Sequence, residues 1–198
     1  MAAMTAGRPN SYEIERVIDQ ATQVFWRQGY QATSIADLLD ATQLSRSSLY
    51  QAFSNKENLF SRCLQNYCDD LAAQLRQQLA DAETGRAFIE TTFMQVARGA
   101  DDPQLRLGCL AMNTAIELGH EDTALAQQAH AGLQQFADIF TAAIRRGQSE
   151  QVIAATLDAD ALGYYLVSGM CGLRTLLKCG AGRSRAEGVA RQVLAALD

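Results

Sequence analysis

The residues between 45 and 51 combine small hydroxyl side chains with groups that can read nucleic acid. Serines at three of these positions are small enough to let a backbone approach phosphates closely. Arg46 can neutralise a phosphate or contact guanine through two hydrogen bonds, and Gln51 can contact adenine in the same way. Tyr50 can donate its hydroxyl to a phosphate. The candidate DNA-contacting set is Ser45, Arg46, Ser47, Ser48, Tyr50 and Gln51.

The charge around this set is compatible with DNA, although the whole chain has a net charge of −5. Residues 1–62 carry six basic and six acidic residues, whereas the remainder carries 11 basic and 16 acidic residues. No acidic residue occurs between Asp40 and Glu57. A surface without negative charge is what phosphate contact requires, whatever the sign of the whole chain.

Helices are expected to position these side chains, because the chain has only two prolines and is rich in residues that favour helix. Ser34 or Thr33 is expected to begin one short helix and Ser45 the next, which forms a helix-turn-helix. A long helix should follow to about residue 81. Further helices are expected at 84–99, 103–119, 122–147, 158–179 and 184–197. The fold class is therefore all-α.

An ordered pattern over residues 29–60 resembles the signature of the TetR family of regulators. It consists of Gly-Tyr at 29–30, Thr-Ser-Ile-x-x-Leu at 33–38, Leu-Ser-x-x-Ser-Leu-Tyr-x-x-Phe at 44–53 and Lys-Glu-x-Leu-Phe at 56–60. Many family members have Ala-Gly-Val where this chain has Thr42-Gln43-Leu44. By position, the resemblance implies phosphate contacts from Thr33, Ser34, Ser45, Tyr50 and Lys56. It places Arg46, Ser47, Ser48 and Gln51 near bases. The alternative is a set of solvated helix faces in an ordinary helical domain.

The resemblance also implies the organisation of the whole chain. Residues 1–58 would form the three-helix DNA-binding domain, and residues 59–198 a helical bundle that senses a small effector and dimerises. The last two long helices would pair with their copies in a homodimer, with Leu173 in the interface. Small residues would permit close approach there: Gly163, Ser168, Gly169 and Gly172. Two recognition helices then face successive major grooves, so the operator should be a palindrome.

The segment 107–118 resembles part of one branch of this family, which includes the repressor of N-ethylmaleimide reductase and acrylate-responsive regulators. In the former, the matching cysteine reacts with electrophiles or oxidants, so the resemblance implies that Cys109 is a sensor. A position early in a helix and Arg106 three residues before it could favour the thiolate. Met112 and Asn113 belong to the same segment. The alternative is a packed, unreactive thiol and a regulator that senses a non-covalent apolar ligand.

An aromatic face at Phe88 and Phe93 is either an effector-pocket lining or plain core. The five cysteines lack any Cys-x-x-Cys pair and are expected to be free thiols in a reducing cytoplasm. No apolar run approaches the ~20 residues that span a bilayer, so no membrane partner is expected. No metal or cofactor is expected, and no pattern typical of catalysis occurs. The rival of a different class is a helical adaptor protein without DNA binding.

Overall fold

The computed structural model describes residues 11–121 and 123–198, and the regular structure in these ranges is entirely helical. The expected all-α fold is thereby confirmed. Contacts divide the chain into two compact units, residues 1–66 and 67–198. Helix α4 (Lys56–Asp81) contributes to both units. The sequence-based boundary at 58/59 and the contact-based boundary at 66/67 both fall within this helix. Among the described helices, none is long and apolar enough to cross a bilayer.

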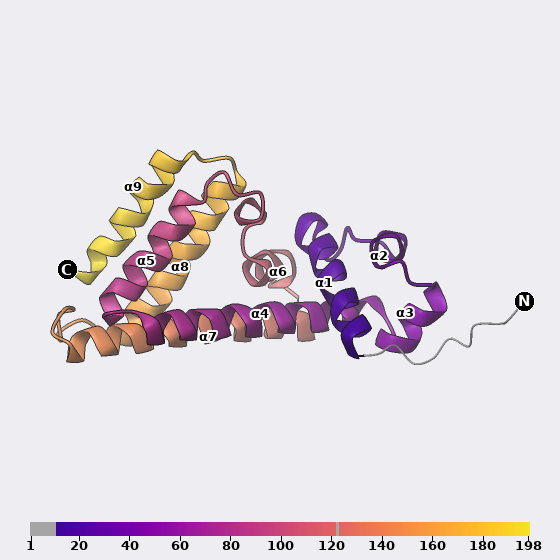
Figure 1. Cartoon of the computed structure of the whole chain (residues 1–198), viewed down its shortest axis with the longest axis horizontal. Helices are drawn as coiled ribbons and strands as arrows, with labels where there is room; N and C mark the ends of the chain where they lie inside the picture. The colour runs from indigo at the N-terminus through magenta and orange to yellow at the C-terminus, as the bar shows by residue number, and fades with distance from the viewer. Residues whose placement is uncertain (1–10, 122) are drawn as a thin grey trace, which may run out of the picture. The chain divides into compact units, whose positions relative to one another are not determined.

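The first unit is a small helical domain with an aromatic centre. It contains α1 (Ser11–Gln28), α2 (Ile35–Thr42), α3 (Arg46–Phe53) and the start of α4 (Figure 1). Phe25 and Phe60 meet edge to face with ring centroids 4.7 Å apart, and Leu38 and Leu49 are fully buried beside the same core. Burying such side chains stabilises the domain by about 1.5–3 kcal/mol each. The expected helix-turn-helix is present at α2 and α3.

Local hydrogen bonds fix both ends of the α2–α3 turn. Ser34 caps α2 in a reciprocal capping box with Asp37, and Ser45 caps α3. Gln43 ends α2 in the left-handed region at φ 57°. Many members of the family that the sequence resembles have glycine at this position, and glycine adopts that conformation without a steric penalty. Gln43 therefore adopts the left-handed conformation that the turn requires, at a cost of about 1–2 kcal/mol in folding free energy relative to glycine.

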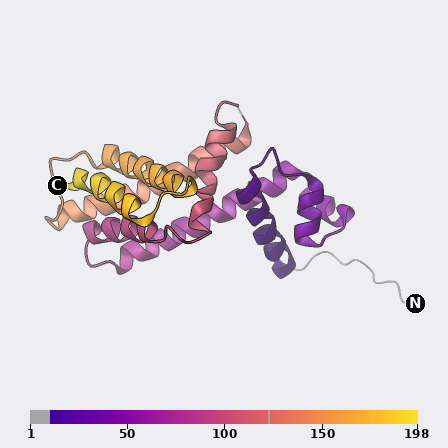
Figure 2. The ribbon, with the colours of Figure 1, turned by 90° about the horizontal axis from the view of Figure 1, so that it is seen from above.

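The second unit is a bundle in which α7 (Ala124–Ser149) is the central helix. Helices α5 (Gly85–Arg98), α6 (Leu110–Leu118) and α8 (Ala159–Lys178) all pack on α7, while α9 (Arg183–Leu194) packs on α5 and α8 (Figure 2). Phe88 and Phe93 each lie with their ring centroids 6.0 Å from that of Phe140, in the core between α5 and α7. The 3-10 helices η1 (Leu105–Leu107) and η2 (Ala195–Leu197) also belong to this unit.

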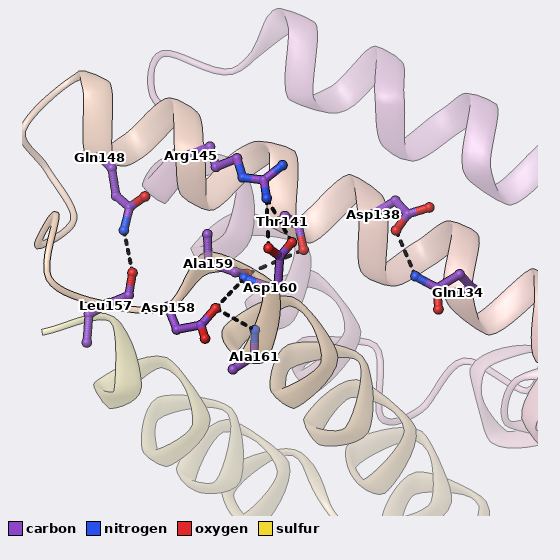
Figure 3. Close-up of polar contacts among 10 residues, drawn as sticks. All are labelled: Gln134, Asp138, Thr141, Arg145, Gln148, Leu157, Asp158, Ala159, Asp160 and Ala161. Carbon is purple, nitrogen blue, oxygen red and sulfur yellow. Dashed lines mark hydrogen bonds and ion pairs between the residues drawn. The ribbon is translucent and has the colours of Figure 1, made fainter.

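The connection from α7 to α8 is held by side chains of both helices (Figure 3). Gln148 donates to the carbonyl of Leu157 at 2.8 Å. Asp158 caps α8 by accepting from two backbone amides of the first turn. Arg145 reaches both carboxylate oxygens of Asp160, at 2.9 and 2.8 Å. These contacts fix the orientation of α8 relative to α7 and therefore which face of α8 packs against α7.

The expected interface residues of α8 separate into two groups in the structure. Leu173 is 0% exposed within the subunit, so its assignment to a dimer interface was wrong. Gly163 and Gly169 also serve internal packing, because a Cβ there would lie 2.1 Å from Thr141 Oγ1 and 2.7 Å from Val193 Cγ1. Ser168 and Gly172 are exposed. The outer face of α8 also carries Tyr164, Tyr165 and Leu176, all exposed large side chains.

The expected helix over 103–119 is interrupted in the structure. Residues 105–107 form a single 3-10 turn, Gly108 adopts φ 80°, and α6 begins only after Cys109. A left-handed residue cannot continue an α-helix. The predicted pairing of Arg106 with Cys109 on one helix face was therefore wrong. Arg106 instead donates to the carbonyl of Ala100 at 2.9 Å.

Candidate nucleic-acid interface and internal cavity

Helix α3 divides its side chains cleanly between core and solvent. Leu49 and Phe53 are buried, whereas Arg46, Tyr50 and Gln51 are exposed on the remaining surface. Ser47 is exposed with them and Ser48 is half-buried. No acidic residue belongs to this helix or its first turn. The exposed face can therefore approach a polyanion without like-charge repulsion.

The three serines at the start of α3 form one hydroxyl cluster. Ser45 Oγ accepts from the Ser48 backbone amide at 3.1 Å. It also lies 2.9 Å from Ser47 Oγ and 2.8 Å from Ser48 Oγ. The first-turn amides of a helix have no intrahelical acceptor, and together with the helix dipole they favour an anion. Small side chains leave these amides accessible to a phosphate.

The side chains at the start of α2 are already engaged within the domain. Thr33 is 1% exposed and its hydroxyl donates to the Gly29 carbonyl at 2.6 Å. The structure therefore contradicts the expected phosphate contact from this side chain. Ser34 is exposed and donates its hydroxyl to Asp37 Oδ2 at 2.7 Å. This hydrogen bond and the Ser34 backbone amide lower the pKa of the Asp37 carboxyl. A phosphate at Ser34 would approach that negative charge.

Lys56 has an internal role that its place in the motif did not indicate. Its ammonium donates to the carbonyls of Tyr30 at 2.9 Å and Thr33 at 3.0 Å. It also lies 4.5 Å from the centroid of the Tyr30 ring, within cation–π range. Lys56 thus ties the α1–α2 connection to the start of α4. One of its three N–H groups remains outside these two bonds and is compatible with the expected phosphate contact.

The second unit contains a small apolar cavity of about 50 Å³. This volume has room for a few water-sized groups and is smaller than a typical drug-sized ligand site. The wall is apolar except for two thiols, one hydroxyl and one guanidinium. The lining residues are Leu71, Leu75, Thr92, Val96, Cys109, Phe136, Phe140, Val167, Met170, Cys171 and Arg174.

Cys109 is both the N-cap residue of α6 and part of the cavity wall. It is 6% exposed. Burial raises the pKa of the Cys171 thiol to about 12, with a smaller contribution from the charge of Cys109. The pKa of the Cys68 thiol is raised to about 12 for the same two reasons, with a small further contribution from Asp69. Cys68 and Cys171 are therefore protonated thiols at neutral pH. Cys179, by contrast with these buried residues, is exposed to solvent.

The other expected effector residues do not line this cavity. Phe88 and Phe93 lie in the core beside Phe140. Asn113 donates to the Leu107 carbonyl at 2.9 Å and so braces the turn before α6. Met112 is half-buried on α6 and is not one of the lining residues. Of the sensor set, only Cys109 reaches the cavity.

The sequence reasoning missed Arg174, the one charged residue in the cavity wall. Its Nη1 donates to the Gly108 carbonyl at 3.3 Å, so it lies beside the turn that carries Cys109. A charged residue within the apolar run of α8 was a signal that could have found it. Across residues 11–121 and 123–198, no cluster of three or more His, Cys, Asp or Glu side chains is suited to a metal ion.

Two protein-family models match most of the chain. Residues 17–63 match the family model described as bacterial regulatory proteins of the tetR family. Residues 85–193 match the model of a tetracyclin repressor-like C-terminal domain.

Individual relatives agree with these matches. The HTH-type transcriptional repressor ComR of Escherichia coli (strain K12) is 34% identical over 57% of this chain, a match that spans only 54% of ComR. The HTH-type transcriptional regulator YezE of Bacillus subtilis (strain 168) is 26% identical over 97% of this chain and 100% of its own length. A cysteine mutant of the regulator CifR, solved with 26 bp operator DNA, superposes with a TM-score of 0.84. It is 26% identical over 96% of this chain and 100% of CifR.

Proposed function

Because this chain belongs to the TetR family of bacterial regulatory proteins, we propose that it binds a palindromic operator as a homodimer and releases it on sensing a small effector. Its relatives are regulators of transcription, and the chain is accordingly a DNA-binding regulator rather than an enzyme or a helical adaptor. Repression is the simplest action for a protein that occupies an operator until an effector arrives. Such a protein acts where the chromosome is, in the cytoplasm.

The exposed face of α3 is the observation that carries the DNA-binding part of the proposal. It combines a serine-capped N-terminus with Arg46, Tyr50 and Gln51 and has no acidic neighbour on the helix. The hydroxyl and backbone amide groups at the N-terminus of α3 suit phosphates. The side chains of Arg46 and Gln51 can each form two hydrogen bonds to a base edge. We therefore assign positioning on the duplex to Ser45 and Tyr50 of this face, and to Lys56 through its remaining N–H group. The hydroxyl of Ser34 is held by Asp37 and is left out of this assignment. Base contacts are assigned to Arg46, Ser47, Ser48 and Gln51.

Gln51→Ala is expected to change base preference rather than overall affinity. A glutamine that contacts adenine through two hydrogen bonds contributes about 1–3 kcal/mol of discrimination at one position. Selection of binding sites from a randomised DNA library would measure this as a relaxed preference at one base pair in each half-site. Gln74→Ala, on an exposed part of α4 in the second unit, is the matched control. An unchanged preference for the Gln51 variant removes this residue from the base contacts.

The cavity in the second unit supports the sensing part of the proposal. Leu71 and Leu75 of α4 form part of its wall, and the same helix begins at Lys56 in the first unit. An occupant that displaced α4 would therefore act on the element that leads to the DNA-binding helices. Two modes remain open for this cavity: modification of Cys109, as the resemblance of its segment to the electrophile-responsive branch implies, or non-covalent binding of an apolar ligand.

Cys109→Ser is expected to leave operator binding intact and to abolish release by a thiol-directed electrophile. Exposed Cys179 would be labelled by any such reagent, so the comparison is made in a Cys179→Ser background. Mass spectrometry with limiting N-ethylmaleimide ranks the remaining thiols, and a parallel DNA-binding titration measures release. Since Cys63, Cys68 and Cys171 all have a pKa of about 12, they should react slowly. If the serine variant still releases DNA with the same reagent, Cys109 is structural and the cavity senses a non-covalent ligand.

A further inference from the structure

Arg174 differs from every other described arginine in how its charge is accommodated. Seven arginines in the described part of the chain make no ion pair with a carboxylate. Six of the seven are exposed to water: Arg16, Arg27, Arg46, Arg62, Arg76 and Arg185. Arg174 is half-buried and lines the cavity. A cation removed from water without a counterion is unfavourable, because its hydration is only partly replaced.

Two of the ionisable groups near Arg174 carry no charge that would offset its own. Burial raises the pKa of Cys171 to about 12 and that of Tyr67 well above its usual value. Both groups are therefore neutral at neutral pH. No aspartate or glutamate lies in the cavity wall. No carboxylate among the described residues therefore offsets the charge of Arg174 within this largely apolar cavity.

The guanidinium also has hydrogen-bonding capacity to spare. An arginine has five N–H donors in a planar fork, and Arg174 uses one of them on the Gly108 carbonyl, at 3.3 Å. The fork matches the two oxygens of a carboxylate, and this pairing is stronger and more directional than a bond between neutral groups. The rest of the cavity wall offers hydrocarbon contacts from residues such as Leu71, Phe136 and Phe140.

We propose that Arg174 binds the carboxylate of an apolar monocarboxylic acid whose hydrocarbon part fills this cavity. The inference rests on the proposed function, in that it names the chemical class of the effector for the same site. Because the wall contains a single cation, we expect the ligand to carry a single anionic group. The apolar remainder of the wall and its small volume correspond to a short hydrocarbon chain.

Calorimetric titration of the full chain tests the proposal with two pairs of probes. Butyrate is compared with butyramide, and 3-methylbutyrate with 3-methylbutyramide, so that each pair differs in charge but little in shape. Wild type should bind at least one carboxylate about tenfold or more tightly than its amide, as expected for a charge-assisted pair. Which carboxylate is preferred distinguishes a straight-chain from a branched effector.

Variants at Arg174 identify the residue responsible. Arg174→Gln should remove the preference for carboxylate over amide, and Arg174→Lys should retain part of it, because a lysine keeps the charge but not the fork. Arg185→Gln removes an exposed, unpaired arginine on α9 and should change nothing. Thermal unfolding checks that each variant is folded, and Arg174→Lys serves if the glutamine variant is not. Equal binding of acid and amide by wild type, no carboxylate binding at millimolar concentration, or a preference that survives Arg174→Gln would each overturn the proposal.

Operator binding is measured separately on the same proteins, so two failures can be told apart. If wild type does not bind DNA, the proposed function fails whatever the calorimetry shows. If a carboxylate binds through Arg174 but does not release DNA, the recognition holds and the assignment of the cavity as the effector site fails. If DNA binding is intact and the carboxylate preference is absent, only the role of Arg174 is overturned.

Discussion

Arg46→Glu should reduce operator affinity by at least one to two orders of magnitude while leaving the protein folded. Arg46 is exposed at the first position of α3, and no acidic residue lies on that helix. A glutamate there replaces an attractive contact by repulsion of the phosphates. A good arginine–base contact contributes about 1–3 kcal/mol, and a dimer loses two of them. The expected loss is therefore about 2–6 kcal/mol, or roughly 30-fold to 10⁴-fold in affinity.

Fluorescence anisotropy with library-selected operator DNA, at several salt concentrations, measures this effect. Arg76→Glu makes the same charge change on an exposed part of α4 in the second unit and is the control for net charge. Arg46→Ala then separates the two contacts that this arginine can make. Loss of a phosphate contact lowers the salt slope by about one per site, whereas loss of a base contact relaxes sequence preference. A loss that is equal in Arg76→Glu and Arg46→Glu would show a global charge effect and remove Arg46 from the interface.

Leu176→Asp should convert the proposed homodimer to monomer and thereby weaken operator binding. The outer face of α8 carries Leu176 and Tyr165, which are 36% and 44% exposed in the isolated subunit. Gly172 lies between them along the helix, with no atom within 4 Å of an added Cβ. Such a face suits the close approach of a second copy. Because a twofold axis duplicates every contact, each substitution would bury two unpaired charges, at several kcal/mol each.

Sedimentation velocity at micromolar concentration gives the oligomeric state directly. Ile116→Asp is the matched control, because Ile116 is a more exposed apolar residue, at 68%, and lies on α6 rather than α8. It should remain dimeric. Leu173→Asp is unsuitable as an interface test, since that side chain is in the core and its replacement would destabilise the second unit itself. A Leu176 variant that stays dimeric, or an Ile116 variant that dissociates, would move the proposed interface away from α8.

Those features of the protein that depend on contacts within a few residues could be predicted from the sequence. The caps at Ser34 and Ser45 are hydrogen bonds to atoms three residues ahead, so the residue types at those positions indicate the helix starts. Most of the helices and the exposed side of α3 could also be predicted, because helical geometry repeats every 3.6 residues. The helix expected over 103–119 was the exception, since it is interrupted at Gly108. The helix-turn-helix and its acid-free face follow from this local pattern.

Features that depend on which elements pack together were decided only by the tertiary structure. Thr33 and Lys56 have residue types that suit phosphates, yet the fold buries the first and directs the second to carbonyls of Tyr30 and Thr33. Apolar residues lie on most sides of α8, so their periodicity could not predict whether Leu173 packs against α7 or against a second copy of the chain. Arg174 lies 66 residues from the Gly108 carbonyl to which it donates. The residue type shows that an apolar side chain favours burial or that a charged one favours a polar partner. Only the packing of segments distant in the sequence determines which residues surround it.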